Sequence, residues 1–255
     1  MNTIFAIAKS TFKETMRQRV LLVLLLFGVV TVASSVLFSY LSTGEEFKFV
    51  VDMGLGAMLI FGLLMATVLG AFMIPTDVER RIIFTILSKP VRRMEFIFGK
   101  FLGALGTIAM NVVLMGIVFL VVYFLKNKFH LQLTAVEAVG LVFFQLAVIL
   151  SIAVTVSTIA TPWFTVIFTM FTYFVGCMNE TLHHIATHAQ STFTRLSMWV
   201  LTVLVPHFEN FDLREKILLE DPVPGMYLVK AIAYALAYIA VMMAFAYLLF
   251  NEREF

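Results

Sequence analysis

Apolar residues fill most of the chain in long runs that short polar stretches separate. A helix needs about 20 apolar residues to cross roughly 30 Å of hydrocarbon. Six runs reach or approach that length: Val20–Leu41, Val50–Ile74, Phe101–Leu125, Ala135–Ile159, Pro162–Met178 and Tyr227–Phe250. The fifth run is the shortest, and the strict alternation of a membrane strand is missing. The pattern therefore predicts an all-α polytopic membrane protein with six transmembrane helices in one domain, residues 1–255.

Two further segments predict helices that do not span. In residues 1–19, one helical face carries apolar side chains and basic residues flank it: Ile4, Phe5, Ala8, Phe12 and Met16, beside Lys9, Lys13 and Arg17. This is typical of an interfacial helix lying in the membrane plane, and it lacks the pattern of a cleavable signal peptide. Within the long polar stretch 179–226, the run 196–205 is too short to span and predicts a re-entrant or interfacial helix.

Composition excludes a soluble protein. Of the 255 residues, 61% are hydrophobic and 13% are charged, whereas soluble domains have about 45–50% apolar and about 25% charged residues. Cys177 is the single cysteine, which excludes an internal disulfide and a cysteine-built metal site.

The distribution of charge predicts the orientation. If the N-terminus is cytoplasmic, most of the 18 lysines and arginines fall on the cytoplasmic side, and the other side is acidic. Loops rich in Lys and Arg stay in the cytoplasm. We therefore expect a multi-pass protein of the plasma (bacterial inner) membrane with both termini cytoplasmic and the segment 179–226 outside.

The loop between the second and third runs is more structured than a connection requires. Pro75 is expected to end the second span, and Thr76-Asp77-Val78-Glu79 fits a capping box that starts a new helix. Apolar residues form one stripe of that helix (Val78, Ile82, Ile83, Ile86 and Leu87), and Ser88-Lys89-Pro90 ends it. A short rigid helix over 76–90 suits transmission of force from a cytoplasmic partner; a basic helix resting on anionic lipid is the alternative.

This loop resembles that of permease subunits of type 2 ABC exporters, most closely the branch associated with multi-copper-enzyme maturation. The resemblance lies in the acidic-basic pair Glu79-Arg80, the closing Leu87-Ser88-Lys89-Pro90-Val91 and the later Gly99-Lys100. Many relatives have Gly-Thr where this chain has Arg81-Ile82-Ile83. The stretch Val205–Asp212 is also similar to a Pro-(Asn/His)-Phe…Phe-Asp signature of that family's outer segment.

The resemblance implies a coupling helix that contacts a separate ATP-binding subunit. Its contact residues would be Thr76, Glu79, Arg80, Arg81, Ile82, Ile83, Ile86, Leu87, Ser88, Lys89 and Pro90. The family further implies that ATP and Mg²⁺ are held by the partner and that two copies of this chain pair within the lipid. In agreement, the sequence has no G-x-x-x-x-G-K-[ST], because Met94 stands where Gly99-Lys100 would need a glycine. We expect no enzymatic activity, no cofactor and no nucleic acid bound by this chain.

Polar residues in the spans give weaker indications. Asp52, Glu137 and Lys230 lie near span ends, and the spans are otherwise almost free of charge, which argues against a carrier driven by protons or sodium ions. Asn111 and Gln145 line a pore or pair helices. The small residues of Gly99-x-x-x-Gly103 either allow close helix packing or simply reflect how common glycine is in spans.

The outer segment contains one candidate metal set. Glu180, His184 and His188 have i, i+4, i+8 spacing, which on a helix would place possible zinc or copper ligands on one face. No HExxH is present, and outward loops often carry histidines without a ligand, so no metal is expected.

Two functions remain open at this stage. The first is the permease subunit of an ATP-driven exporter. The second is a membrane scaffold or assembly factor that transports nothing and uses the same loop to hold a cytoplasmic partner.

Overall fold

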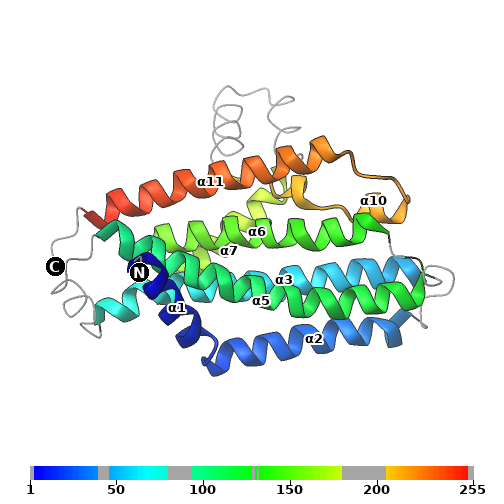
Figure 1. The fold of residues 1–255 in the computed structure, drawn as a ribbon, viewed down its shortest axis with the longest axis horizontal. Helices are drawn as coiled ribbons and strands as arrows, with labels where there is room; N and C mark the ends of the chain where they lie inside the picture. The colour runs from blue at the N-terminus through cyan, green and yellow to red at the C-terminus, as the bar shows by residue number, and fades with distance from the viewer. Residues whose placement is uncertain are drawn as a thin grey trace, which may run out of the picture.

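The computed structural model of the protein describes residues 3–39, 46–79, 93–127, 130, 132–179 and 205–251. Its elements are α1 (Thr3–Thr15), α2 (Arg19–Ser39), α3 (Glu46–Glu79), α5 (Arg93–Lys126), α6 (Leu133–Ser157), α7 (Pro162–Gly176), the 3-10 turn η1 (Phe208–Phe211), α10 (Arg214–Leu218) and α11 (Gly225–Asn251). The long helices run along one axis of an elongated bundle (Figure 1). Across the described ranges every regular element is helical, which confirms the predicted all-α class.

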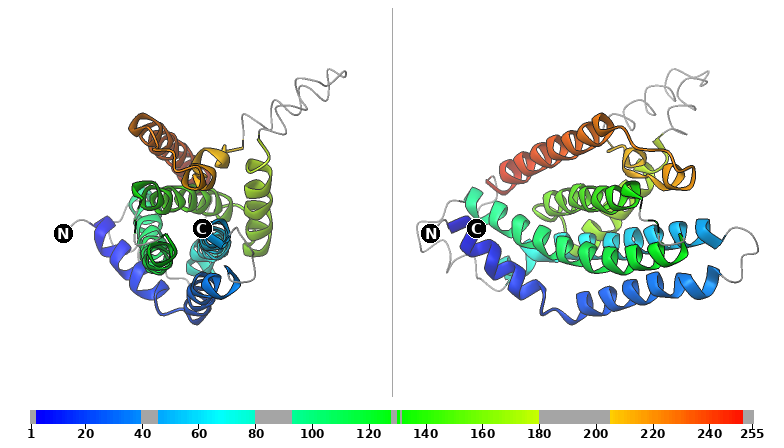
Figure 2. Two further views of the ribbon diagram at one scale, coloured as in Figure 1. Left: turned by 90° about the vertical axis from the view of Figure 1, so that its right-hand side faces the viewer. Right: turned by 45° about the vertical axis from the view of Figure 1, so that its right-hand side comes forward.

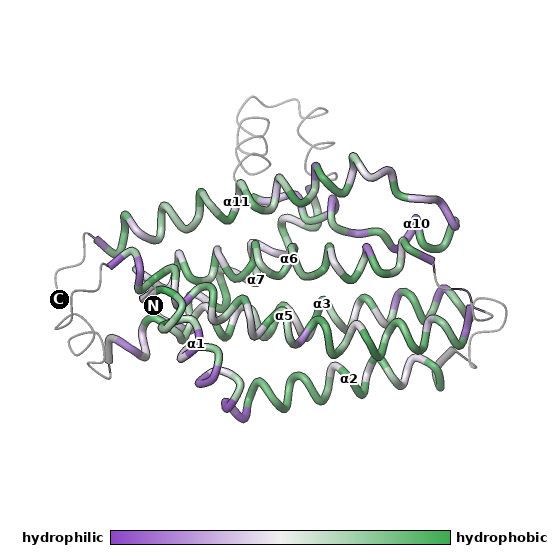
Figure 3. Tube along the Cα trace, viewed as in Figure 1, coloured by the Kyte–Doolittle hydropathy of each residue, from purple (hydrophilic) through white to green (hydrophobic). Residues whose placement is uncertain are grey.

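Five helices of the described part are long and apolar enough to cross a membrane, namely α2, α3, α5, α6 and α11. Their middle portions are mostly hydrophobic and the most polar residues gather toward the ends (Figure 3). α7 has 15 residues, a length of about 22 Å at 1.5 Å per residue. Because this is shorter than the hydrocarbon core of about 30 Å, the sixth span stays a prediction.

α3 and α6 form the centre of the bundle. They pack against each other, α2 lies on α3 and α5, α7 lies on α3 and α6, and α11 lies mainly on α6. The view along the bundle shows α7 at its side and α11 at its edge (Figure 2). Large apolar side chains of the outer helices remain exposed, among them Leu26, Phe27, Leu236 and Phe245. Such exposure fits side chains that face lipid.

Different contacts join the helices at the two ends of the bundle. At one end, the Arg93 Nη1 group donates hydrogen bonds to the carbonyl oxygens of Phe250 (3.3 Å) and Asn251 (3.0 Å), so the start of α5 meets the end of α11. α1 lies at this end, which we call the α1 end (Figure 1). At the other end, Lys126 and Glu46 form an ion pair of 3.1 Å between α5 and α3. We call it the α10 end.

The prediction that the second span stops at Pro75 is wrong. α3 continues through Pro75 to Glu79, so Thr76 lies inside a helix and is not the N-cap of a new one. Proline removes one backbone hydrogen bond, but here the loss falls in the last turns of a long helix, where it does not end the helix. The residues 80–92, with most of the predicted coupling helix, lie outside the described residues.

The apolar pattern of α1 predicted a helix in the membrane plane and did not predict a face packed against protein. Thr11 and Thr15 are buried, whereas the Phe5 side chain is 65% exposed. α1 turns Ile7, Thr11 and Phe12 toward the glycines of α5 and leaves the Phe5 ring outside. The helix thus rests against protein on one side and can face lipid with Phe5.

Within the described residues, the stretch 205–219 packs as a layer over the α10 end. Phe208, Phe211 and Leu213 are each 1% exposed. The backbone N–H of His207 donates to the hydroxyl of Tyr234 (3.1 Å), and the Tyr227 hydroxyl donates to the carbonyl of Asn210 (2.9 Å). η1 and α10 were not predicted. The predicted helix 196–205 lies outside the described residues except for Val205.

Candidate functional site

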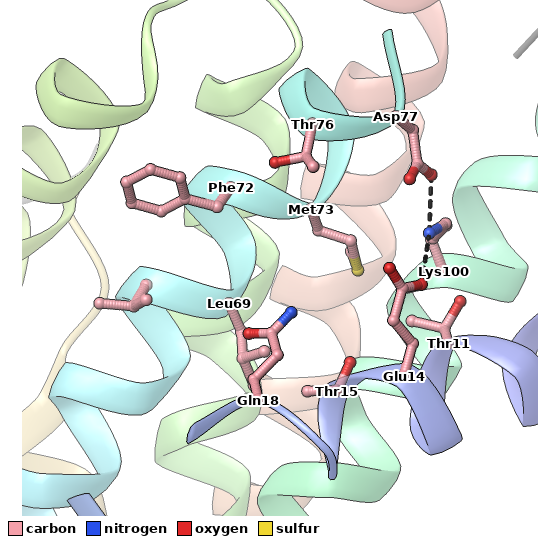
Figure 4. Close-up of a pocket in the computed structure, with 11 residues that line it drawn as sticks. Thr11, Glu14, Thr15, Gln18, Leu69, Phe72, Met73, Thr76, Asp77 and Lys100 are labelled. Carbon is pink, nitrogen blue, oxygen red and sulfur yellow. Dashed lines mark ion pairs between the residues drawn. The ribbon is translucent and has the colours of Figure 1, made fainter. Parts of the chain in front are cut away.

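A buried ion pair joins α3 to α5 at the α1 end. The Lys100 ammonium lies 2.6 Å from the Asp77 carboxylate, and the two side chains are 9% and 4% exposed. The Glu14 carboxylate of α1 is 4.0 Å from the same ammonium. Figure 4 shows the three side chains converging from three helices. One lysine therefore links α1, α3 and α5.

The position of each charge explains why the pair is needed. Asp77 lies in the last turns of α3, where the helix dipole disfavours negative charge. Lys100 lies seven residues after the start of α5 and is buried. A buried charge is stable only with a partner, and removing one partner of such a pair costs about 3–5 kcal/mol. Each of the two residues therefore holds the other in place.

A small cavity lies beside this ion pair, lined by Thr11, Glu14, Thr15 and Gln18 of α1, by Val68, Leu69, Phe72, Met73, Thr76 and Asp77 of α3, and by Lys100. Its volume is about 50 Å³. A water molecule occupies about 30 Å³ of liquid volume, so the cavity has room for water but not for a nucleotide or a transported molecule. The arrangement can transmit a displacement from helix to helix, and it contains no constellation for bond chemistry.

Glycines of α5 let α1 approach closely. A Cβ atom at Gly103 would lie 2.6 Å from the carbonyl oxygen of Ala8 and 2.6 Å from Thr11 Cβ. One at Gly99 would lie 2.8 Å from Ile7 Cβ. Of the two interpretations of this glycine spacing, the structure supports close packing, and the helix packed there is α1.

Comparison with known families gives one result. The family model described as "ABC-2 family transporter protein" matches residues 5–255, which is nearly the whole chain. The chain belongs to the ABC-2 transporter family. A comparison with curated proteins gives no match.

Family membership fits the predicted resemblance at a coarser level. ABC-2 permeases are membrane components of transport systems and are not themselves the ATPase; they generally work with a separate ATP-binding subunit. This ABC-2 protein is therefore assigned to the permease class of ABC transporters. The match does not distinguish the branch associated with multi-copper-enzyme maturation from others.

The predicted coupling residues begin at this site. Thr76 lines the small cavity, and Glu79 is the last residue of α3. The others lie outside the described residues: Arg80, Arg81, Ile82, Ile83, Ile86, Leu87, Ser88, Lys89 and Pro90. Asp77 and Lys100 thus stand shortly before and shortly after residues 80–92, and the ion pair joins the two helices that flank those residues.

The sequence reasoning missed the partnership of Glu14, Asp77 and Lys100. It predicted spans almost free of charge, and Asp77 and Lys100 lie just outside the predicted runs 50–74 and 101–125 but inside α3 and α5. A signal existed, because a lysine one residue before an apolar run of about 25 positions needs a carboxylate partner if its helix is packed on all sides. The sequence did not show that α5 begins at Arg93 and so places Lys100 inside the bundle.

The other polar residues singled out in the sequence have different surroundings. Asn111 Nδ2 donates to the Met65 sulfur and so pairs α5 with α3. Gln145 instead lines a cavity. Within the described residues, no group of three or more His, Cys, Asp or Glu side chains could hold a metal ion. The candidate metal residues Glu180, His184 and His188 lie outside those residues, so that prediction stays untested.

Proposed function

We propose that the chain is the transmembrane permease subunit of an ATP-driven exporter of the plasma membrane. It would have six spans, both termini in the cytoplasm and the α10 end outside. Two copies would pair in the membrane and work with two ATP-binding subunits, which hold ATP and Mg²⁺. The resemblance to the multi-copper-enzyme-maturation branch is part of the same proposal.

The observation that carries the proposal is the ion pair at the base of the 80–92 segment. A partner that moves this segment moves the end of α3 first. Because Asp77 is held by Lys100 at 2.6 Å, α5 must follow, and α1 follows through Glu14 and the glycine contacts. The three helices would thus move as one unit, which is the requirement for switching a permease between inward- and outward-facing states.

The test uses charge reversal in the coupling segment. The chain is co-expressed with a candidate ATP-binding subunit from its own genome, and co-purification and ATP hydrolysis are measured in reconstituted membranes. Arg80→Glu/Arg81→Glu is expected to lower both by about tenfold, because several charge-assisted contacts are reversed. Lys230→Glu, at an exposed position near the start of α11, is the control and should leave both unchanged.

Unchanged co-purification of the Arg80→Glu/Arg81→Glu variant would overturn the assignment of this segment. If the partner binds but hydrolysis is never stimulated by the chain, the scaffold function replaces the permease function. Elution of the variant as a monodisperse species shows that it has folded.

A further inference from the structure

A second and larger cavity lies at the α10 end, remote from the ion pair. Its volume is about 800 Å³, within the usual range of about 300–1,000 Å³ for ligand sites. α3, α6, α7, η1 and α10 all contribute to its wall. The cavity therefore lies between the layer formed by η1 and α10 and the helices α3, α6 and α7.

Six charged side chains line this cavity: Lys48, Asp52, Glu209, Asp212, Arg214 and Glu215. They comprise four carboxylates and two cations, so their formal charge is negative. Arg214 Nε lies 3.6 Å from the Asp212 carboxylate, and Lys48 and Glu209 have interactions of their own. Asp52 is half-buried and has no ion-pair partner among the described residues.

The rest of the lining is mostly apolar and includes one amide. Leu59 lies seven residues after Asp52 on α3, about 10 Å further into the bundle. Tyr173 and Phe208 add aromatic rings. Gln145 is only 3% exposed and lines the cavity. No hydrogen bond joins its amide to another residue in the part of the chain that the structure describes. Because the amide borders the cavity, this group is available for a ligand.

We propose that this cavity binds an amphiphile that carries one ammonium group. The ammonium would lie beside Asp52, where negative charge is in excess, and the apolar body would contact Leu59, Tyr173 and Phe208. Gln145 would bond a polar atom of that body. The ammonium can come from a soluble amine or from the headgroup of an aminophospholipid. The inference goes beyond the proposed function, since it requires neither the ATP-binding subunit nor a particular membrane orientation.

Cys177 provides a readout inside the cavity, because it lines the wall and is the single cysteine of the chain. The purified chain in nanodiscs is treated with N-ethylmaleimide at fixed pH, and the rate of Cys177 alkylation is measured by mass spectrometry. Three probes of matched size are added: 4-phenylbutylamine, 4-phenylbutan-1-ol and 4-phenylbutanoate. The amine is expected to slow alkylation saturably, and the alcohol and the carboxylate to need at least about tenfold higher concentrations.

Variants connect the protection to the proposed contacts. Asp52→Asn is expected to weaken protection by the amine about tenfold and to leave the effect of the alcohol unchanged. Asp221→Asn removes an exposed carboxylate from the same end that does not line the cavity, and it should have no effect. A thermal unfolding midpoint equal to that of the unchanged protein shows that Asp52→Asn is folded.

Nanodiscs with phosphatidylethanolamine, compared with discs of phosphatidylglycerol alone, distinguish the two sources of the ammonium group. Protection by the aminophospholipid identifies a lipid ligand, and protection by the soluble amine alone identifies a soluble one. Equal protection by all three probes, stronger protection by the carboxylate, or full protection in Asp52→Asn would overturn the proposal. The coupling experiment above does not depend on any of these outcomes.

Discussion

At the scale of single residues, Lys100 is the position on which the α1 end depends. Its ammonium lies 2.6 Å from Asp77 and 4.0 Å from Glu14, and its side chain is 9% exposed. Asn111 and Thr155 also join helices: the Thr155 hydroxyl donates to the carbonyl of Met242 at 2.9 Å. Those contacts are neutral hydrogen bonds, each contributing about 0.5–1.5 kcal/mol, so the charged contact is the one whose loss matters most.

Replacing Lys100 by methionine should destabilise the protein. Lys100→Met removes the ammonium that lies 2.6 Å from the buried Asp77 carboxylate, and we expect a loss of about 3–5 kcal/mol. Asp77→Leu in the same chain removes the stranded charge and should restore most of that loss. The thermal midpoint of the protein in nanodiscs, measured for both single variants and the double variant, gives the interaction energy of the pair.

The double variant also separates stability from coupling. If the ion pair transmits motion, Lys100→Met/Asp77→Leu should be as stable as the unchanged chain but should stimulate the ATP-binding subunit less. Full stimulation in the stable double variant would contradict transmission through this pair.

At the scale of elements, the packing of α1 against α5 determines the shape of the α1 end. Gly99, Gly103 and Gly106 provide the contact surface, and Thr11 and Thr15 are buried on the facing side. α1 is therefore a packed part of the bundle as well as an amphipathic helix. Its link to α3 runs through Lys100 of α5, which lies 4.0 Å from Glu14 and 2.6 Å from Asp77, and across the small cavity.

A larger side chain at Gly103 should detach α1. Because a Cβ there would lie 2.6 Å from the Ala8 carbonyl oxygen, Gly103→Leu forces the helix away from α5. In a Cys177→Ser background, the reactivity of Thr15→Cys toward maleimide should rise by about tenfold as the buried position opens. Gly140→Ala is the matched control, since no atom lies within 4 Å of its Cβ position. Equal reactivity in both variants would show that α1 does not depend on this contact.

At the scale of the whole molecule, the positions of the helix ends fix which segments share a side. The end of α3, the start of α5 and the end of α11 meet at the α1 end through the contacts of Lys100 and Arg93. η1 and α10 cover the opposite end, where the Tyr227 hydroxyl donates to the carbonyl of Asn210 in η1 and the Tyr234 hydroxyl accepts from the N–H of His207 just before it. The small cavity and the large one therefore lie at opposite ends of one bundle.

This arrangement predicts labelling from opposite sides of the membrane. In a Cys177→Ser background, a membrane-impermeant maleimide should label Asp221→Cys in intact cells and Lys13→Cys only after the membrane is opened. The Cys177→Ser chain without added cysteine gives the background. Labelling of Lys13→Cys in intact cells would reverse the proposed orientation, and labelling of both would contradict the common position of the helix ends.

The sequence predicted the fold class and the approximate location of the spans because hydrophobic runs report the apolar layer directly. It did not predict the helix ends. α3 extends the predicted run 50–74 to Glu46 and Glu79, and α5 extends the run 101–125 to Arg93, because helices continue through polar residues that composition counts as loop. α3 also continues through Pro75, at which the sequence predicts its end.

The candidate site was predicted only in part. Local pattern pointed to Thr76, which lines the small cavity, although as an N-cap that it is not. The meeting of Glu14, Asp77 and Lys100 depends instead on how three helices cross. The cavity beside Gln145 depends equally on contacts between α3, α6 and η1 that are distant in sequence. Periodicity reports which face of a helix is apolar, but it does not report which neighbour covers that face, as the exposed Phe5 ring shows.

The packing of α1 against the glycines of α5 has a consequence for biogenesis. α1 ends at Thr15, and the first of these glycines is Gly99. During synthesis the helix is therefore complete well before the surface that it packs against exists. At about 5–20 residues per second, the delay is on the order of 5–20 s. During that interval the bilayer surface is the apolar environment nearest to the nascent helix. The amphipathic pattern of residues 1–19 therefore suits a nascent chain in which α1 first lies on the bilayer surface. Once the glycines of α5 have been synthesised, they define where α1 packs in the folded protein.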